Sequence, residues 1–276
     1  MSAPIAVRIG PRTAVTLLIA SAFGVVSFFW PFFVSPGSTL GASDVAPLIF
    51  GALLLLVLGV VLAQVSEGGL DSKALALLGV LSAIGAALRP LGAGTAGVEL
   101  IFFLLVLGGR ALGPGFGFSL GCTTLFASAL ITAGVGPWMP YQMFACAWIG
   151  LGAGLLPRAA GRREIWMLVA YATAAAFLYG LLLNLSFWPF TLGADTQLSF
   201  LPGAPLAENL HRYLVFDVTT SLGWDTGRAI TNGVLILIAG RPVLDALRRA
   251  SRRAAFDAPA TFEPAYRAAA RPSREP

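Results

Sequence analysis

Long apolar runs, separated by short breaks rich in proline and glycine, make up most of the chain. A helix that crosses the hydrocarbon core of a bilayer needs about 20 mostly apolar residues. Against that length the pattern predicts eight helices, at residues 13–34, 46–65, 73–91, 97–112, 115–134, 139–157, 165–187 and 211–240. The breaks hold helix-ending sequences such as Ser35-Pro36-Gly37. The sequence therefore predicts an all-α protein, a polytopic membrane helix bundle with about eight transmembrane helices.

The composition supports a membrane protein and excludes several other classes. Only 11% of the residues are charged and 57% are hydrophobic, with a mean hydropathy of +0.81. Soluble domains carry about 25% charged residues, which excludes a soluble enzyme, a disordered protein and a nucleic-acid-binding domain despite the net charge of +5. The single histidine and the absence of P-loop, G-x-S-x-G and H-E-x-x-H motifs argue against catalysis. We expect no enzyme activity, metal site or cofactor in this chain, and packing roles for Cys122 and Cys146.

The arginines predict how the helices are oriented. They cluster at residues 8–12, 158–163 and 241–274, at the ends of apolar runs or beyond the last one. Lys and Arg accumulate in cytoplasmic loops. Eight crossings with both termini in the cytoplasm bring these clusters, Lys73 and Arg110 to the inner side of the plasma membrane.

Three parts are expected along the chain. Residues 1–72 hold an N-terminal tail and two helices, residues 73–240 hold the other six helices, and residues 241–276 form a basic cytoplasmic tail. Residues 241–253 have the pattern of a short amphipathic basic helix, which anionic lipids of the inner leaflet attract. The rest of the tail lacks apolar periodicity, so we expect most of it to be disordered.

The last predicted helix carries a polar stripe. At 100° per residue, a set of six side chains falls within an arc of about 100°: Asp217, Ser221, Trp224, Asp225, Arg228 and Asn232. One interpretation is a structural ion pair of Asp225 and Arg228, three residues apart, with Asn232 in reach of Arg228. The other is that the outer part of the stripe, with Asp217 and Trp224, faces a polar ligand.

Further aromatic and polar side chains gather at the predicted outer ends of the helices. Each alone has a simpler interpretation: aromatic residues form interfacial belts, and Arg89 and Glu99 could pair across their short loop. Their convergence favours a ligand site. The predicted substrate-binding set is Arg89, Trp138, Gln142, Asn184, Trp188, His211, Asp217 and Trp224.

The third predicted helix has a strip of small residues, Gly79, Ala83 and Ala87, which Ala76 and Ala86 widen. Small residues four apart let another helix approach closely inside a membrane. The strip suits either internal packing or the docking of a partner. The pairs Gly117/Gly121 and Gly150/Gly154 have the same spacing, and we expect them to pack inside the bundle.

The stretch from residue 74 to 157, with RPLGAG, GPGFGFSLG and GPWMPYQM in that order, resembles the substrate-binding S component of energy-coupling factor (ECF) vitamin transporters. The later DVTTSLGWDTGRAITN is also similar to members of this family. The resemblance implies a six-helix core over residues 73–240, preceded by two added helices. It also implies a vitamin binder that docks onto a transmembrane coupling protein and two ATPases, which use the ATP, and that topples in the membrane to release its ligand inside.

The GPW-type loop followed by a glutamine is most similar to members assigned to cobalamin or related corrinoids. Thiamine precursors, queuosine precursors and other flat heterocycles stay open as substrates. Two further interpretations also stay open: a self-sufficient secondary permease for a small organic solute, and a membrane scaffold without a ligand. In each case the partners are the lipid bilayer and small molecules or membrane proteins, with no nucleic acid.

Overall fold

The computed structural model describes residues 9–33, 46–67, 70, 72–92, 95–192 and 196–254. Within this part of the chain there are eight α-helices, two 3-10 turns and no strand. The helices are α1 (Pro11–Phe29), α2 (Ala46–Ser66), α3 (Ser72–Leu88), α4 (Ile101–Leu112), α5 (Pro114–Ile131), α6 (Met139–Leu155), α7 (Gly161–Thr191) and α8 (Leu206–Ala254), with the turns η1 (Trp30–Phe33) and η3 (Arg89–Gly92). The predicted all-α fold class is confirmed.

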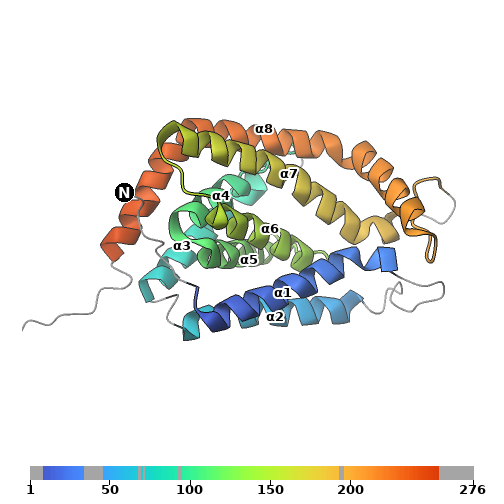
Figure 1. The fold of residues 1–276 in the computed structure, drawn as a ribbon, viewed down its shortest axis with the longest axis horizontal. Coiled ribbons are helices and arrows are strands. Elements are labelled where there is room, and N and C mark those ends of the chain that lie inside the picture. The colour runs from blue at the N-terminus through green and yellow to red at the C-terminus, as the bar shows by residue number, and fades with distance from the viewer. Residues whose placement is uncertain are drawn as a thin grey trace, which may run out of the picture.

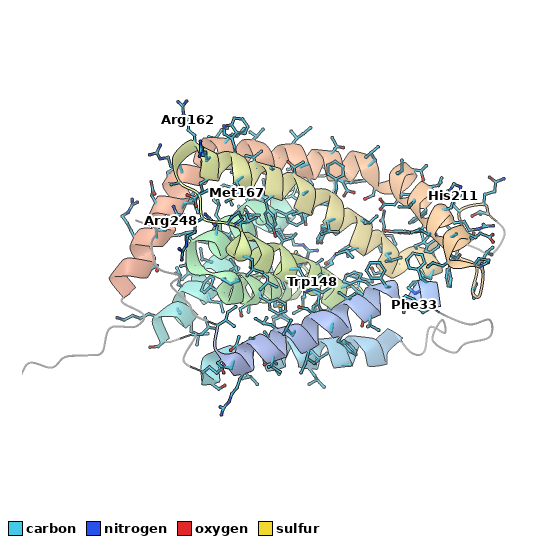
Figure 2. All side chains as sticks on the ribbon, in the orientation of Figure 1. Phe33, Trp148, Arg162, Met167, His211 and Arg248 are labelled. Carbon is cyan, nitrogen blue, oxygen red and sulfur yellow. The ribbon has the colours of Figure 1, made fainter. Side chains whose placement is uncertain are left out.

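The helices run lengthwise between two ends of the molecule (Figure 1). The long helices α7 and α8 lie together along one side, α4, α5 and α6 lie in the middle, and the α1–α2 hairpin lies along the opposite side. Figure 2 places Arg162 and Arg248 at one end, called here the arginine end, and His211 and Phe33 at the other, called the His211 end.

Five helices of the described chain are long and apolar enough to cross a membrane, namely α1, α3, α5, α7 and α8. With 12 residues, α4 is shorter, and it begins at Ile101, not at the predicted residue 97. The cause is the backbone before it. Gly97 has a φ of +81°, and a Cβ there would lie 2.1 Å from the carbonyl oxygen of Trp224. Gly97 is itself buried against α8, and irregular backbone is tolerated in membrane proteins where it packs against protein.

The centre of the bundle depends on glycine. A Cβ on Gly150 would lie 2.1 Å from the carbonyl oxygen of Gly117, and one on Gly121 would lie 2.4 Å from the backbone nitrogen of Ala147. No larger residue fits at either position without moving a helix. As predicted, these glycines let α5 and α6 approach closely inside the bundle.

The α1–α2 hairpin packs on α5, α6 and α7. On α1, the Ser21 hydroxyl accepts a hydrogen bond of 3.1 Å from the Trp148 indole N–H, and Gly24 makes room for that ring. At the arginine end, the Glu67 carboxylate accepts hydrogen bonds from the backbone N–H groups of Arg12 and Thr13, both at 2.7 Å, and from the Thr13 hydroxyl. The Thr13 hydroxyl bond above all holds the pKa of Glu67 below its ordinary value. The hairpin is thus tied to itself and to the rest of the bundle.

Helix α8 continues without a break past residue 240, through Pro242 to Ala254. Leu244 and Leu247 in this extension are buried and join the main apolar core. The amphipathic basic helix expected at residues 241–253 is therefore the last part of α8. The disorder predicted for the remaining tail concerns residues 255–276, which lie outside the described residues.

Candidate functional site

Polar side chains inside the bundle gather at two levels. At the arginine end, Glu164 is buried and accepts hydrogen bonds from the Arg110 Nε–H at 2.7 Å and from Arg248 Nη2 at 2.6 Å. The three residues belong to α7, α4 and α8. Arg110 also donates to the backbone carbonyl of Leu156, at 2.9 Å. At this level Glu164 connects three helices, and its carboxylate is fully used in these contacts.

The second level lies nearer the His211 end and is built around Arg228 on α8. Its guanidinium donates to Asp225 Oδ1 at 2.5 Å and to Glu99 Oε2 at 2.7 Å. The Arg228 Cζ atom also lies 4.8 Å from the centre of the Tyr179 ring and 5.5 Å from that of Phe102. The ion pair expected from the three-residue spacing is present. The alternative Arg89–Glu99 pair is wrong, because Glu99 is bound to Arg228.

Asn232, one turn further along α8, holds the start of α4. Its Oδ1 accepts from the Phe103 backbone N–H at 2.7 Å, and its Nδ2 donates to the Glu99 carbonyl at 2.8 Å. The same Nδ2 reaches the backbone carbonyl of Arg228 at 2.8 Å, not its side chain. Asn232 thereby satisfies backbone groups that the irregular segment before α4 leaves unpaired.

Arg89 and Gln142 form a separate side of the second level, on η3 and α6. Arg89 in η3 donates to the Gln142 Oε1 on α6 at 2.8 Å and makes a longer contact of 3.4 Å to the Ser128 hydroxyl on α5. Further toward the His211 end, the Asn184 amide on α7 donates to Asp217 Oδ1 on α8 at 2.7 Å. Two pairs of predicted site residues are thus in contact.

These groups lie at similar depths in the bundle. Along α6, Gln142 is about 21 Å from Leu156, and along α7, Tyr179 is about 22 Å from Glu164, at 1.5 Å per residue. Leu156 and Glu164 both bind Arg110, so they mark a common starting level. Helix α4, which follows Glu99, also packs against α6, which carries Gln142. The two sides therefore border one interior region.

We call this region the polar layer. It comprises Arg89, Glu99, Gln142, Asn184, Asp217, Asp225 and Arg228. Asn184 and Asp217 form its outermost part, about 30 Å along α7 from Glu164. An apolar bundle retains such groups where they are paired or used, so the polar layer is the candidate site.

The other predicted site residues lie outside the polar layer. Trp188 is fully buried, donates its indole N–H to the Leu198 carbonyl at 2.7 Å, and packs against the rings of Phe200 and Tyr213. Trp138 and Trp224 are half exposed, and His211 is exposed. Trp138 caps the start of α6, one turn before Gln142.

Two residues of the layer or its lining, Glu99 and Tyr179, are in neither the predicted substrate-binding set nor the predicted ion pair. Glu99 is the one charged residue between Arg89 and Arg110 in the sequence, and this isolation is a signal that could have placed it in a site. Tyr179 is buried against Arg228 and comes from an ordinary apolar run, so no local pattern distinguishes it.

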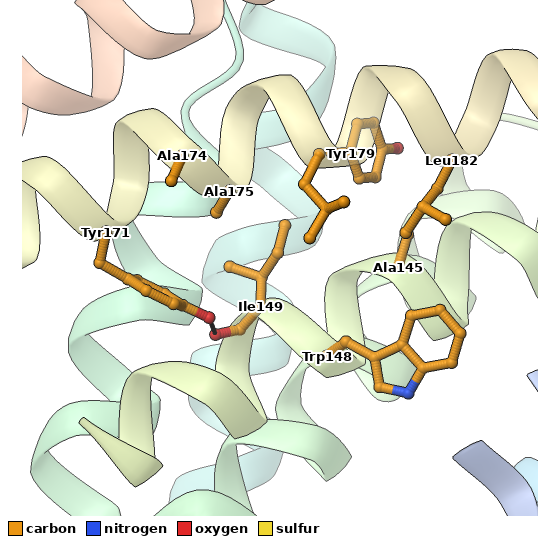
Figure 3. Close-up of a pocket in the computed structure, with 9 residues that line it drawn as sticks. Ala145, Trp148, Ile149, Tyr171, Ala174, Ala175, Tyr179 and Leu182 are labelled. Carbon is orange, nitrogen blue, oxygen red and sulfur yellow. Dashed lines mark hydrogen bonds between the residues drawn. The ribbon is translucent and has the colours of Figure 1, made fainter. Parts of the chain in front are cut away.

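A pocket of about 140 Å³ lies between α6 and α7 (Figure 3). Its lining is mostly apolar: Ala145, Trp148, Ile149, Tyr171, Ala174, Ala175, Leu178, Tyr179 and Leu182. The Tyr171 hydroxyl already donates to the Ile149 carbonyl at 2.7 Å. The pocket gives a polar ligand no charged partner, which favours the polar layer as the candidate site.

The small-residue strip of α3 is exposed. Gly79, Ala83 and Ala87 all face outward, and no atom lies within 4 Å of a Cβ placed on Gly79. Ala76 is exposed beside them, but Ala86 is buried, so it does not widen the strip. The strip is open along α3 on a face that the α1–α2 hairpin does not cover.

The comparisons with known proteins agree with this architecture. A family model described as "ECF transporter, substrate-specific component" matches residues 73–219, more than half of the chain. No curated protein and no solved structure matches this chain. The match begins with α3 and leaves the α1–α2 hairpin outside. The chain belongs to the family of substrate-specific components of ECF transporters.

Proposed function

We propose that this chain captures a vitamin at the His211 end, on the outer face of the membrane, and delivers it inward through a coupling protein and two ATPases. The observation that carries the proposal is the polar layer. Five of its seven side chains come from the segments after α3 that the family model covers, and Asp225 and Arg228 follow on the same helix as Asp217. Irregular backbone at residues 95–100 borders it, a feature that often marks binding sites inside membranes.

Cobalamin or a related corrinoid is the vitamin that we propose first. The support is the resemblance of the GPW-type loop and Gln142 to members assigned to that substrate. A large planar ligand with an amide fringe also suits a site with the side chains of Gln142, Asn184 and Arg89, which offer directed hydrogen bonds.

The coupling protein is proposed to dock on the α3 strip of Gly79, Ala83 and Ala87. Helices approach closely over small residues where lipid gives no hydrophobic drive for association. The strip lies on the outer surface of α3, whereas the polar layer lies inside the bundle. Docking and ligand binding should therefore be separable by mutation.

An uptake assay with a matched control tests the proposal. In cells that carry a coupling protein and both ATPases, we expect Ala83→Trp to abolish cobalamin uptake. The same variant, purified in detergent, should bind cobalamin as the wild type does in calorimetry. Val26→Trp is the control, because Val26 is 68% exposed on α1, away from the strip; it should leave uptake intact.

The outcomes separate the alternatives. Uptake that persists when the ATPases are inactivated would show a self-sufficient permease and would refute the ECF proposal. Normal uptake by Ala83→Trp would refute the docking face. If the wild type binds no corrinoid but retains another vitamin through purification, seen by mass spectrometry, the substrate is wrong and the transport role stands.

A further inference from the structure

We infer that the ligand carries an anionic group, a carboxylate or a phosphate, and that this group pairs with Arg89. The inference rests on the proposed function, because it assigns a substrate chemistry to the same polar layer. It follows from a comparison of Arg89 with Arg110 and Arg228, two other arginines that lie inside the bundle.

Two of these arginines have acidic partners. Arg110 pairs with Glu164 at 2.7 Å, and Arg228 pairs with Asp225 at 2.5 Å and with Glu99 at 2.7 Å. Arg89 differs. Among the described residues, its hydrogen-bond partners are the neutral Gln142 and Ser128, and none is a carboxylate.

Neutral partners orient a guanidinium but do not pair directly with its charge. Arg89 is partly buried, and Gln142 holds it at about 21 Å from the level of Leu156. Arg89 directly follows α3, and Gln142 and Ser128 lie within about one turn of the ends of α6 and α5, so the guanidinium is near the outer end of the bundle. An arginine that is kept in a bundle without an acidic partner marks a candidate functional group. Glu99, which acts on the same interior region, is already bound to Arg228. No carboxylate of the described residues therefore binds Arg89 directly, and its guanidinium is open to one from a ligand.

The geometry leaves donors free for an anion. A guanidinium has five N–H donors, and the two contacts of Arg89 use one hydrogen on each terminal nitrogen. The others suit the paired oxygens of a carboxylate or a phosphate, which arginine binds with two parallel hydrogen bonds. Gln142 keeps the planar group in a fixed orientation while the anion binds.

Matched probes test this inference on the full chain in detergent. The carboxylate arm compares biotin with biotin amide, pantothenate with panthenol, and nicotinate with nicotinamide. The phosphate arm compares thiamine monophosphate with thiamine, and cobinamide phosphate, a corrinoid with a phosphate, with cobinamide, which lacks it. For the pair of probes that binds, we expect the protein's affinity for the anionic form to be about tenfold to 100-fold higher than its affinity for the neutral form. The responding arm identifies the anion.

Variants then assign the preference to Arg89. Arg89→Gln should weaken binding of the anionic form more than binding of the neutral form and bring the two within about twofold of each other, a change in their ratio that a folding defect would not cause. Arg89→Lys should restore part of the preference. Arg212→Gln is the control, because Arg212 is an outer-end arginine already paired with Glu208 at 3.0 Å; it should keep the full preference.

Three results would overturn the inference. The first is a neutral form that binds as tightly as its anionic counterpart, and the second is an Arg89→Gln variant that keeps the preference. Either leaves the proposed function intact. The third is that no probe binds, that cells with a coupling protein and both ATPases take up none of the probes, and that mass spectrometry finds no other vitamin retained by the purified protein. The proposed function then falls, and the inference falls with it.

Discussion

At the residue scale, the two sides of the polar layer differ in how their charges are balanced. Arg228 is held by Asp225, Glu99 and two aromatic rings, so it has no free role left. Arg89 is held by the neutral Gln142, and Asp217 by the neutral Asn184. The Arg228 cluster suits a structural role. The Arg89–Gln142 and Asp217–Asn184 pairs suit contact with a ligand.

Substitutions should separate these roles. Gln142→Ala removes the partner that orients Arg89, and loss of one buried hydrogen bond costs about 1–3 kcal/mol, or about five- to 150-fold in affinity. We expect Gln142→Ala and Trp138→Ala each to weaken cobalamin binding at least several-fold in calorimetry. Arg228→Ala should mainly lower the yield of folded protein, because it strands two carboxylates at a cost of about 3–5 kcal/mol. Equal binding by both of the first two variants would show that the site lies elsewhere.

At the element scale, the α1–α2 hairpin is the part of the bundle outside the family match. Its ends are fixed by different means. Glu67 supplies acceptors to the unpaired N–H groups at the start of α1, whereas Trp30 and Phe32 in η1 pack against the rings of Phe200 and Trp188. The hairpin thereby joins the buried aromatic cluster at the His211 end.

The Glu67 contact predicts a pH dependence. The pKa of Glu67 is lowered in the folded chain, mainly by the Thr13 hydroxyl, so its contribution to stability is present above the unfolded pKa of about 4.3. The contribution is lost as the pH falls through the still lower folded pKa. The midpoint temperature of thermal unfolding should be higher for the wild type than for Glu67→Gln at pH 7. This difference in midpoint should shrink below about pH 4. A difference that stays constant down to pH 3 would contradict this role.

At the scale of the whole molecule, charge is distributed unevenly between the two ends. Arg162 and Arg248 lie at one end (Figure 2), and α1 begins and α8 ends there too (Figure 1). Basic residues accumulate on the cytoplasmic side of membrane proteins. The arginine end is therefore expected to face the cytoplasm, with the polar layer nearer the outer surface.

Reporter fusions test this orientation. Two reporters are fused after Pro276. The one that works only in the cytoplasm should give a signal, and the one that works only after export should give none. A fusion in the loop between α5 and α6, near Val135, should give the opposite pattern, because that loop lies at the other end of both helices. Export of the C-terminal reporter would refute the predicted topology.

The sequence by itself determined the helices, their number and the charge at the arginine end, because apolar length and local composition are properties of single segments. It also located the glycine pairs of α5 and α6, since a four-residue spacing sets one helix face. The contacts of Glu99 required the tertiary structure. Its partner Arg228 lies 129 residues away, and only the packing of α4 against α8 brings the two together in place of the nearby Arg89. The same holds for Trp188, which resembles an interfacial aromatic residue in sequence but is buried by Phe200 and Tyr213. Ion pairing and burial depend on neighbours from distant segments, and these neighbours are set when the helices pack.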